Sequence, residues 1–115
     1  MKTHTLIATL SFVIGAAAAC GPPSRDNAVQ KSAELACNRY QKCGTLDANY
    51  ASFGECRADW ERRFYDTWPE SRCEDIDPEQ LDECQVRIET FDCDGGLIDI
   101  ALVLAGTCSA NQVCE

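Results

Sequence analysis

The segment SFGECRADWERRFYDTWP, residues 52–69, has the clearest helical pattern in the chain. Ser52 and Glu55 have the spacing of a capping box, which marks the start of a helix. Pro69 cannot continue a helix, so we expect the helix to end beside it. Between these signals, large apolar side chains recur every three or four residues and form one strongly aromatic face: Phe53, Cys56, Trp60, Phe64 and Trp68.

Two further segments carry helix signals on either side of this one. Asn27 and Gln30 form a capping pair for a helix that we expect to stop near Gly44. Asp77 followed by Pro78 is typical of a helix start, because Asp caps the first turn and proline fits the first helical position. Both segments then show apolar residues at helical spacing, which predicts amphipathic helices.

A fourth segment follows Asp94 and two glycines and extends to Gly106. Its β-branched residues would also suit a strand, but its apolar residues do not alternate with polar ones, so a helix is favoured. The segment is apolar nearly all round, which is typical of a helix at the centre of a bundle. The sequence therefore predicts an all-α fold with four helices.

Nine of the 115 residues are cysteine, a proportion typical of short secreted chains. The chain has no C-x-x-C motif and its single histidine is His4, so zinc-finger, c-type haem and thioredoxin-like sites are excluded. We expect a small, disulfide-stapled four-helix bundle with four intradomain disulfides, and among the pairings Cys108–Cys114 is favoured. The cysteines assigned to disulfides are Cys37, Cys43, Cys56, Cys73, Cys84, Cys93, Cys108 and Cys114.

Residues 1–19 resemble an export signal, with Lys2 followed by an apolar run too short to span a bilayer. The run ends at Ala17-Ala18-Ala19, before Cys20. This ending suits an ordinary signal peptidase, and it also resembles a bacterial lipobox, although leucine is usual at the position of Ala17. Lipidation of Cys20 would leave an even number of cysteines, so we favour it over simple secretion with Cys20 as a thiol. The predicted organisation is a signal peptide (1–19), a lipidated N-terminus and tether (20–26) and a cysteine-rich helical domain (27–115).

The charge and the residue types argue against several functions. Acidic residues outnumber basic ones by 19 to 10, and a net charge of −9 argues against nucleic acid as a partner. Removal of residues 1–19 would remove His4, the side chain best suited to proton transfer, so we expect no catalytic residues and no enzyme activity. The acidic run from Glu74 to Glu83 does not match a calcium-binding loop, because Gln80 and Val86 replace its glycine and glutamate. No metal and no other cofactor is expected.

Two groups of side chains in residues 52–72 have a structural and a functional interpretation. Aromatic residues at helical spacing are more often core than a ligand platform, and we expect Trp60, Phe64, Tyr65 and Trp68 to be core. The arginines could bind an anion, but pairing with the surplus carboxylates is favoured. They are Arg57, Arg62, Arg63 and Arg72.

The run CNRYQKCG, residues 37–44, resembles the C-x-R-Y-x-x-C-G opening of a family of small cysteine-rich bacterial lipoproteins of unknown function. The similarity extends over about residues 29–114, through RADW at 57–60, TWP at 67–69 and QVC at 112–114. Members of that family are associated with natural-product biosynthesis. The resemblance implies an envelope lipoprotein and supplies no catalytic residue.

The expected function is therefore that of a membrane-anchored lipoprotein of the bacterial cell envelope, on its periplasmic or outer-surface side. It would have a binding or support role, with a link to natural-product biosynthesis. Its partners would be the membrane, through the lipid on Cys20, and a protein or small molecule that the sequence does not identify. The alternative is a soluble secreted disulfide-rich inhibitor or signalling protein.

Overall fold

The computed structural model describes residues 23–115, apart from the side chains of residues 96–98. The predicted signal peptide and Cys20 lie outside this range. The described chain is mostly helical and has no strand, only an isolated β-bridge between Ile76 and Cys114, so the predicted all-α class is confirmed. Its six helices are α2 (Arg25–Cys43), α3 (Leu46–Asn49), α4 (Phe53–Thr67), α5 (Pro78–Thr90), α6 (Gly96–Ala105) and α7 (Ala110–Val113).

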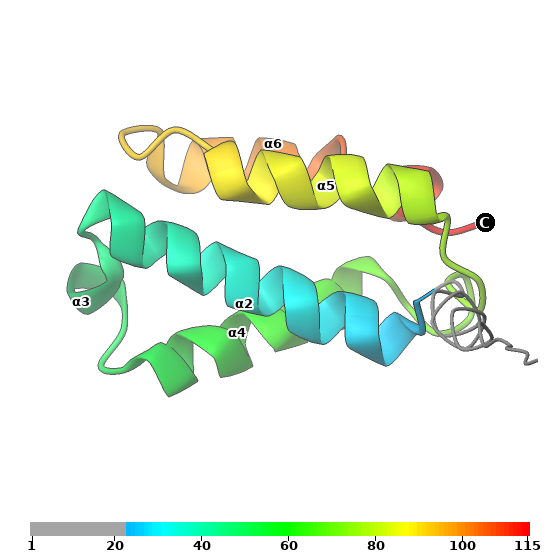
Figure 1. Cartoon of the computed structure of the whole chain (residues 1–115), viewed down its shortest axis with the longest axis horizontal. Coiled ribbons are helices and arrows are strands. Elements are labelled where there is room, and N and C mark those ends of the chain that lie inside the picture. The colour runs from blue at the N-terminus through cyan, green and yellow to red at the C-terminus, as the bar shows by residue number, and fades with distance from the viewer. Residues whose placement is uncertain (1–22) are drawn as a thin grey trace, which may run out of the picture.

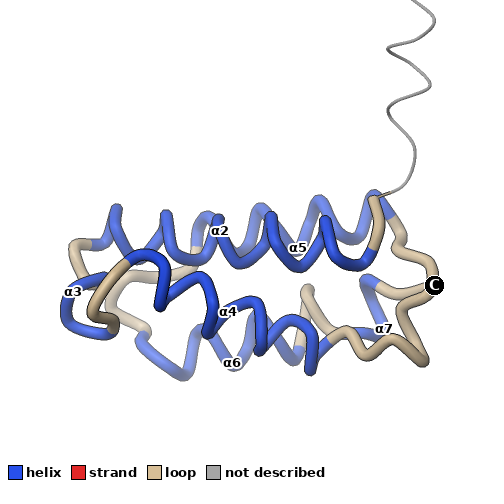
Figure 2. The backbone as a smooth tube through the Cα atoms, turned by 90° about the horizontal axis from the view of Figure 1, so that it is seen from below, coloured by secondary structure: helices blue, strands red, loops and turns tan. Residues whose placement is uncertain are grey.

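The four long helices form two antiparallel pairs (Figure 1). Helix α2 packs against both α4 and α5, and α6 packs against α5. Seen from below, α4 and α6 lie on the same side of the bundle (Figure 2). The start of α2 and the C-terminus lie at the same end of the molecule (Figures 1 and 2).

Helix α2 begins three residues earlier than a cap at Asn27 would place it. Ser24 is the N-cap and its Oγ accepts a hydrogen bond from the Asn27 N–H at 3.1 Å, so Asn27 is a donor inside the first turn and does not cap the helix. The predicted stop at Gly44 is confirmed. Gly44 has a φ of 71°, a left-handed conformation that glycine adopts without steric cost, and its N–H donates to the Gln41 carbonyl.

The predicted caps of α4 and α5 are confirmed. Ser52 Oγ accepts from the Glu55 N–H, and Asp77 accepts from the N–H groups of Glu79 and Gln80. These bonds satisfy donors that the first turn of a helix otherwise leaves without partners. At the other end of α4, a residue distant in the sequence satisfies the backbone. Arg25 of α2 donates a hydrogen bond to the Trp68 carbonyl oxygen at 2.6 Å.

The core is built around a column of aromatic rings on α4. Ring centroids lie 5.6 Å apart between Trp60 and Phe64 and 4.8 Å apart between Phe64 and Trp68. All three residues are buried, as the sequence predicted. The indole N–H of Trp68 donates to the Cys108 carbonyl at 2.7 Å, which joins the column to the segment after α6. Tyr65 departs from the prediction, since it is half-buried and its hydroxyl donates to Asp26.

Helix α6 does not occupy the centre of the bundle, so that prediction was wrong. Ile100 and Val103 are buried, but Leu102 is 65% exposed and Ala101 and Ala105 are exposed as well. The aromatic column of α4 already fills the interior beside α2, and the short α6 packs mainly on α5. An all-apolar sequence signals burial only where the larger side chains of other helices leave room for it.

The four disulfides each join separate elements. Cys37–Cys56 links α2 to α4, and Cys43–Cys93 links the end of α2 to the loop before α6. Cys84–Cys108 links α5 to the turn after α6, and Cys73–Cys114 links the α4–α5 loop to the C-terminus. Four intradomain disulfides from the eight predicted cysteines are therefore present.

The favoured pairing of Cys108 with Cys114 was wrong. Helix α7 separates the two residues, and Cys108 is buried where it meets Cys84 of α5. The chain after α7 runs beside the α4–α5 loop, where Ile76 forms the bridge with Cys114, and this pairing brings Cys114 to Cys73. Closeness in sequence favoured the local pair, whereas the helix between the two cysteines directs them to different partners.

This connectivity predicts the outcome of a single cysteine substitution. In Cys73→Ala, we expect Cys114 to be the one of the seven remaining disulfide cysteines that alkylates without reduction, because its partner is absent. Tandem mass spectrometry after alkylation at mildly acidic pH, which slows thiol exchange, would locate the label. A label on Cys108 or Cys84 would contradict the connectivity.

Candidate functional site: a polar cavity between α4 and α6

A cavity of about 330 Å³ lies where α4 faces α6. This volume is near the lower end of the range for small-molecule sites, about 300–1,000 Å³. Its walls come from α2, from α3 and the residue after it, from α4 and from α6. The lining residues are Tyr40, Asn49, Tyr50, Asp59, Trp60, Arg63 and Ile100.

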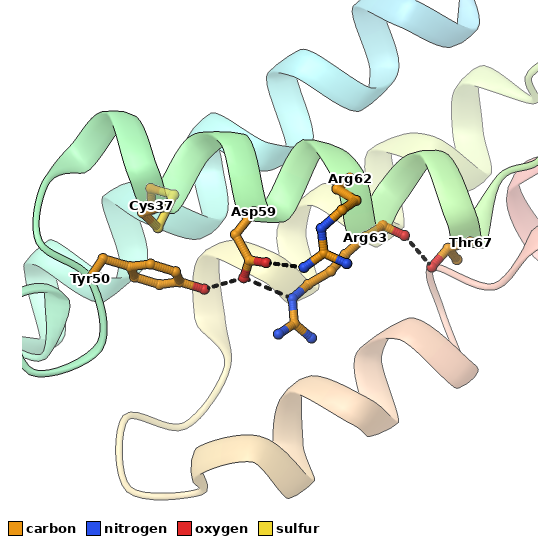
Figure 3. A network of polar contacts seen from close by, with 7 residues as sticks. Cys37, Tyr50, Asp59, Arg62, Arg63 and Thr67 are labelled. Atoms are coloured by element: carbon orange, nitrogen blue, oxygen red, sulfur yellow. Dashed lines mark hydrogen bonds and ion pairs between the residues drawn. A yellow bond between two sulfur atoms is a disulfide. The ribbon is translucent and has the colours of Figure 1, made fainter.

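Asp59 is the centre of a hydrogen-bond network on the wall formed by α4 (Figure 3). Asp59, Arg62 and Arg63 are three and four residues apart, so their side chains share one face of the helix. Asp59 Oδ2 accepts from the Tyr50 hydroxyl at 2.7 Å and from Arg63 Nε at 3.0 Å. Its other oxygen, Oδ1, accepts from Arg62. Tyr50 reaches this carboxylate because α3 ends one residue before it.

The network fixes the charge state of the site. Burial by itself raises the pKa of Asp59, but the hydrogen bonds from Tyr50, Arg63 and Arg62 outweigh it and hold the pKa below its ordinary value. Burial and the bond to Asp59 raise the pKa of Tyr50 far above its ordinary value. Burial also raises the pKa of Tyr40. At neutral pH the site therefore holds an ionised Asp59 and two protonated tyrosines, which can donate hydrogen bonds.

Arg63 is anchored through only part of its guanidinium. Nε donates to Asp59, and the group lies 5.4 Å from the centroid of the Trp60 ring. The terminal nitrogens make no hydrogen bond to the described residues, and they point away from Asp59 on the side where α6 lies (Figure 3). An anchored guanidinium with its terminal edge available is suited to bind an anion.

Trp60 contributes a second donor without a partner. Its side chain is only 3% exposed, and its indole N–H is buried without an acceptor in the part of the chain that the structure describes. A buried donor in this condition costs about 1–3 kcal/mol relative to one with a partner. The Tyr40 ring lies beside it, at 6.3 Å between centroids.

The sequence pointed to Trp60 and to the arginines of α4, but it did not show that they take part in one site. Salt-bridge pairing is confirmed for Arg57 with Glu61 and for Arg62 and Arg63 with Asp59. Arg72 instead bonds to the amide oxygen of Asn111. The i, i+4 spacing of Asp59 and Arg63 around Trp60 was the available signal, but nothing in the sequence placed Tyr40 or Ile100 beside them.

Three further observations concern metal binding, the acidic run and membrane spanning. Within residues 23–115, no group of three or more His, Cys, Asp or Glu side chains is arranged to hold a metal ion. The acidic residues from Glu74 to Glu83 surround the start of α5, where negative charge favours the helix dipole. None of the helices described is both long and apolar enough to cross a membrane.

Comparison with known proteins identifies a family. Residues 37–115 match the model of a family of unknown function, DUF6184. The chain belongs to DUF6184. The DUF6184 match begins at Cys37 and so includes all four disulfides and every residue that lines the cavity. No curated protein and no solved structure matches the chain. The disulfides of this DUF6184 member indicate an oxidising, extracytoplasmic compartment.

The depressed pKa of Asp59 predicts a pH-dependent effect of Asp59→Asn. The carboxylate stabilises the fold above the pKa of an unfolded Asp, about 3.9, and this contribution is lost as the pH falls through the lower folded pKa. We expect the variant to be less stable than wild type by about 1 kcal/mol at pH 7, with the difference shrinking toward pH 2. Guanidinium denaturation at several pH values measures it.

Asp66→Asn is the matched control, because Asp66 lies on the same helix but is exposed and makes no ion pair in the described chain. Its free energy of unfolding should equal that of wild type or exceed it slightly, since a negative charge near the C-terminus of a helix is unfavourable. An Asp59→Asn difference that stays constant from pH 7 to pH 2 would contradict the assigned ionisation.

Proposed function

We propose that this chain is an exported, lipid-anchored protein of the bacterial cell envelope, and that its helical domain binds a small molecule near the membrane surface. The observation that carries the proposal is the cysteine pairing. The four disulfides use eight of the nine cysteines, and the ninth is Cys20, which lies outside the described residues. Cys20 directly follows Ala17-Ala18-Ala19, where a lipobox cysteine would stand.

The start of the domain supports a short tether. Helix α2 begins at Arg25, five residues after Cys20. Residues 20–24 can span at most about 17 Å when fully extended, so a lipid on Cys20 would keep the bundle close to the bilayer. A single acyl chain anchors weakly, whereas the two or three chains of a bacterial lipoprotein anchor stably.

A binding role fits the cavity better than catalysis. Residues 20–115 contain no histidine. The cavity tyrosines have raised pKa values, so neither serves as a base near neutral pH, and Asp59 is held by three hydrogen bonds. The cavity offers hydrogen-bond donors and aromatic walls, which suit recognition of a small organic molecule. The association with natural-product biosynthesis rests on the resemblance to cysteine-rich lipoproteins, and such a ligand would be consistent with it.

Metabolic labelling with a fatty-acid analogue in the native host tests the anchor. We expect wild type to incorporate the label and to fractionate with membranes, and Cys20→Ala to do neither. Ala17→Leu, which supplies the usual lipobox residue, is the control and should label at least as strongly as wild type. Equal labelling of wild type and Cys20→Ala, or no labelling of wild type and Ala17→Leu, would overturn the anchored model and favour a soluble secreted inhibitor or signalling protein.

A further inference from the structure

We propose that the cavity between α4 and α6 binds a small organic carboxylate, held by the terminal edge of Arg63 and by the donors of Tyr40 and Trp60. The proposal deepens the binding role given above and rests on it. Four features of the cavity support this assignment.

The first feature is that both terminal nitrogens of Arg63 lack a hydrogen-bond partner among the described residues, unlike those of the other arginines that line cavities. Arg25 and Arg39 also line cavities, but each donates through both Nε and Nη2 to main-chain carbonyl oxygens. Arg63 donates to Asp59 through Nε alone, within the chain described. Its side chain is held in place, so binding through the terminal nitrogens costs little conformational entropy.

The second feature is the local charge. The network contains one carboxylate, Asp59, and two guanidinium groups, Arg62 and Arg63, which gives it one net positive charge. Asp59 is the carboxylate that affects Arg63 most strongly, through a hydrogen bond and its charge. The chain as a whole has a net charge of −9, so this positive site stands out on an acidic protein. One positive charge matches a monovalent anion, whereas phosphate would bring a second negative charge close to Asp59.

The third feature is a pair of donors on the same cavity. The Trp60 indole N–H is buried without an acceptor among the described residues. The Tyr40 hydroxyl donates no hydrogen bond to those residues, and burial raises its pKa more than the adjacent Trp60 indole N–H lowers it, so the hydroxyl stays protonated at neutral pH. A carboxylate has two oxygens that can accept from the guanidinium and from these donors together. Binding would then relieve the cost of the unpaired indole N–H.

The fourth feature is the chemistry of the remaining walls. The rings of Tyr40 and Trp60 and the side chain of Ile100 give the cavity apolar surface beside its donors. A volume of about 330 Å³ suits a molecule with one ring, not a folded chain segment. Benzoate combines a ring with a monovalent carboxylate, so it is the probe for the test.

The two tryptophans of the chain supply a direct readout and its internal control. Trp60 lines the cavity, whereas the indole N–H of Trp68 donates to the Cys108 carbonyl in the core. In ¹H–¹⁵N spectra of the oxidised, exported protein, we expect benzoate to shift the indole signal of Trp60 saturably and to leave that of Trp68 in place. Trp68→Phe assigns the two signals. Benzyl alcohol, which lacks the charge, and inorganic phosphate should cause no saturable shift.

Substitution of the arginines tests the assigned contact. Arg63→Gln should raise the dissociation constant for benzoate at least about tenfold, and Arg63→Lys, which keeps the charge but not the planar fork, should raise it less. Arg62→Gln is the matched control, because Arg62 also bonds to Asp59 but is exposed and does not line the cavity. Because the charge of Arg62 is exposed and screened, this variant should raise the constant by only about twofold to threefold, well below the effect of Arg63→Gln. An unchanged Trp68 signal shows that each variant is folded.

Several results would overturn the proposal. They are the absence of a saturable Trp60 shift at millimolar benzoate, equal shifts with phosphate or benzyl alcohol, and equal effects of Arg63→Gln and Arg62→Gln. None of these results would alter fatty-acid labelling at Cys20, so failure of the ligand assignment is distinguishable from failure of the anchored model. If Cys20→Ala loses the fatty-acid label and the protein gives no benzoate response, the anchored model is supported and the ligand assignment is overturned.

Discussion

The Cys37–Cys56 disulfide is the constraint on which the rest of the structure depends. It joins α2 to α4 one helical turn before Trp60, and so it fixes the position of the aromatic column against α2. The column in turn reaches the Cys84–Cys108 disulfide through the bond from Trp68 to the Cys108 carbonyl. Two disulfides and one hydrogen bond thus connect α2, α4, α5 and the turn after α6 through the centre of the protein.

This frame also determines the candidate site. Helix α6 packs mainly on α5, so its distance from α4 is held by the covalent links at its two ends, Cys43–Cys93 before it and Cys84–Cys108 after it. Ile100 of α6 and Arg63 of α4 both line the cavity between these links. A cavity bounded by cross-linked helices keeps its donors in place without a ligand, and such preorganisation favours binding. The same disulfides that require export therefore shape the site.

Local signals in the sequence predicted the parts of the fold that local interactions determine. Ser52 with Glu55, Asp77 with Pro78, and Gly44 satisfy backbone groups of their own helix ends, so each could be identified from its neighbours. Contacts between distant segments could not. The prediction that α6 lies at the centre of the bundle was wrong, because the aromatic side chains of α4 already fill the interior beside α2.

The predicted disulfide pairing was wrong and the site was missed for the same reason. Nothing in the sequence shows that α7 turns Cys114 away from Cys108 and toward Cys73. Likewise the sequence predicted that the arginines pair with carboxylates, but it did not name Asp59 as their partner, and Tyr40 and Ile100 reach the cavity only through the packing of α2 and α6.

Reversible unfolding with and without reductant tests most directly whether the disulfides hold this fold. Closing loops of 19 to 50 residues stabilises a protein by about 3–4 kcal/mol per disulfide, and four such terms exceed or equal the whole stability of a typical domain, about 5–15 kcal/mol. Circular dichroism should show a cooperative helical transition for the oxidised protein and little helix for the reduced protein at 25 °C. A reduced protein that keeps its helical signal and its cooperative transition, with all eight thiols accessible to alkylation after unfolding, would contradict the account.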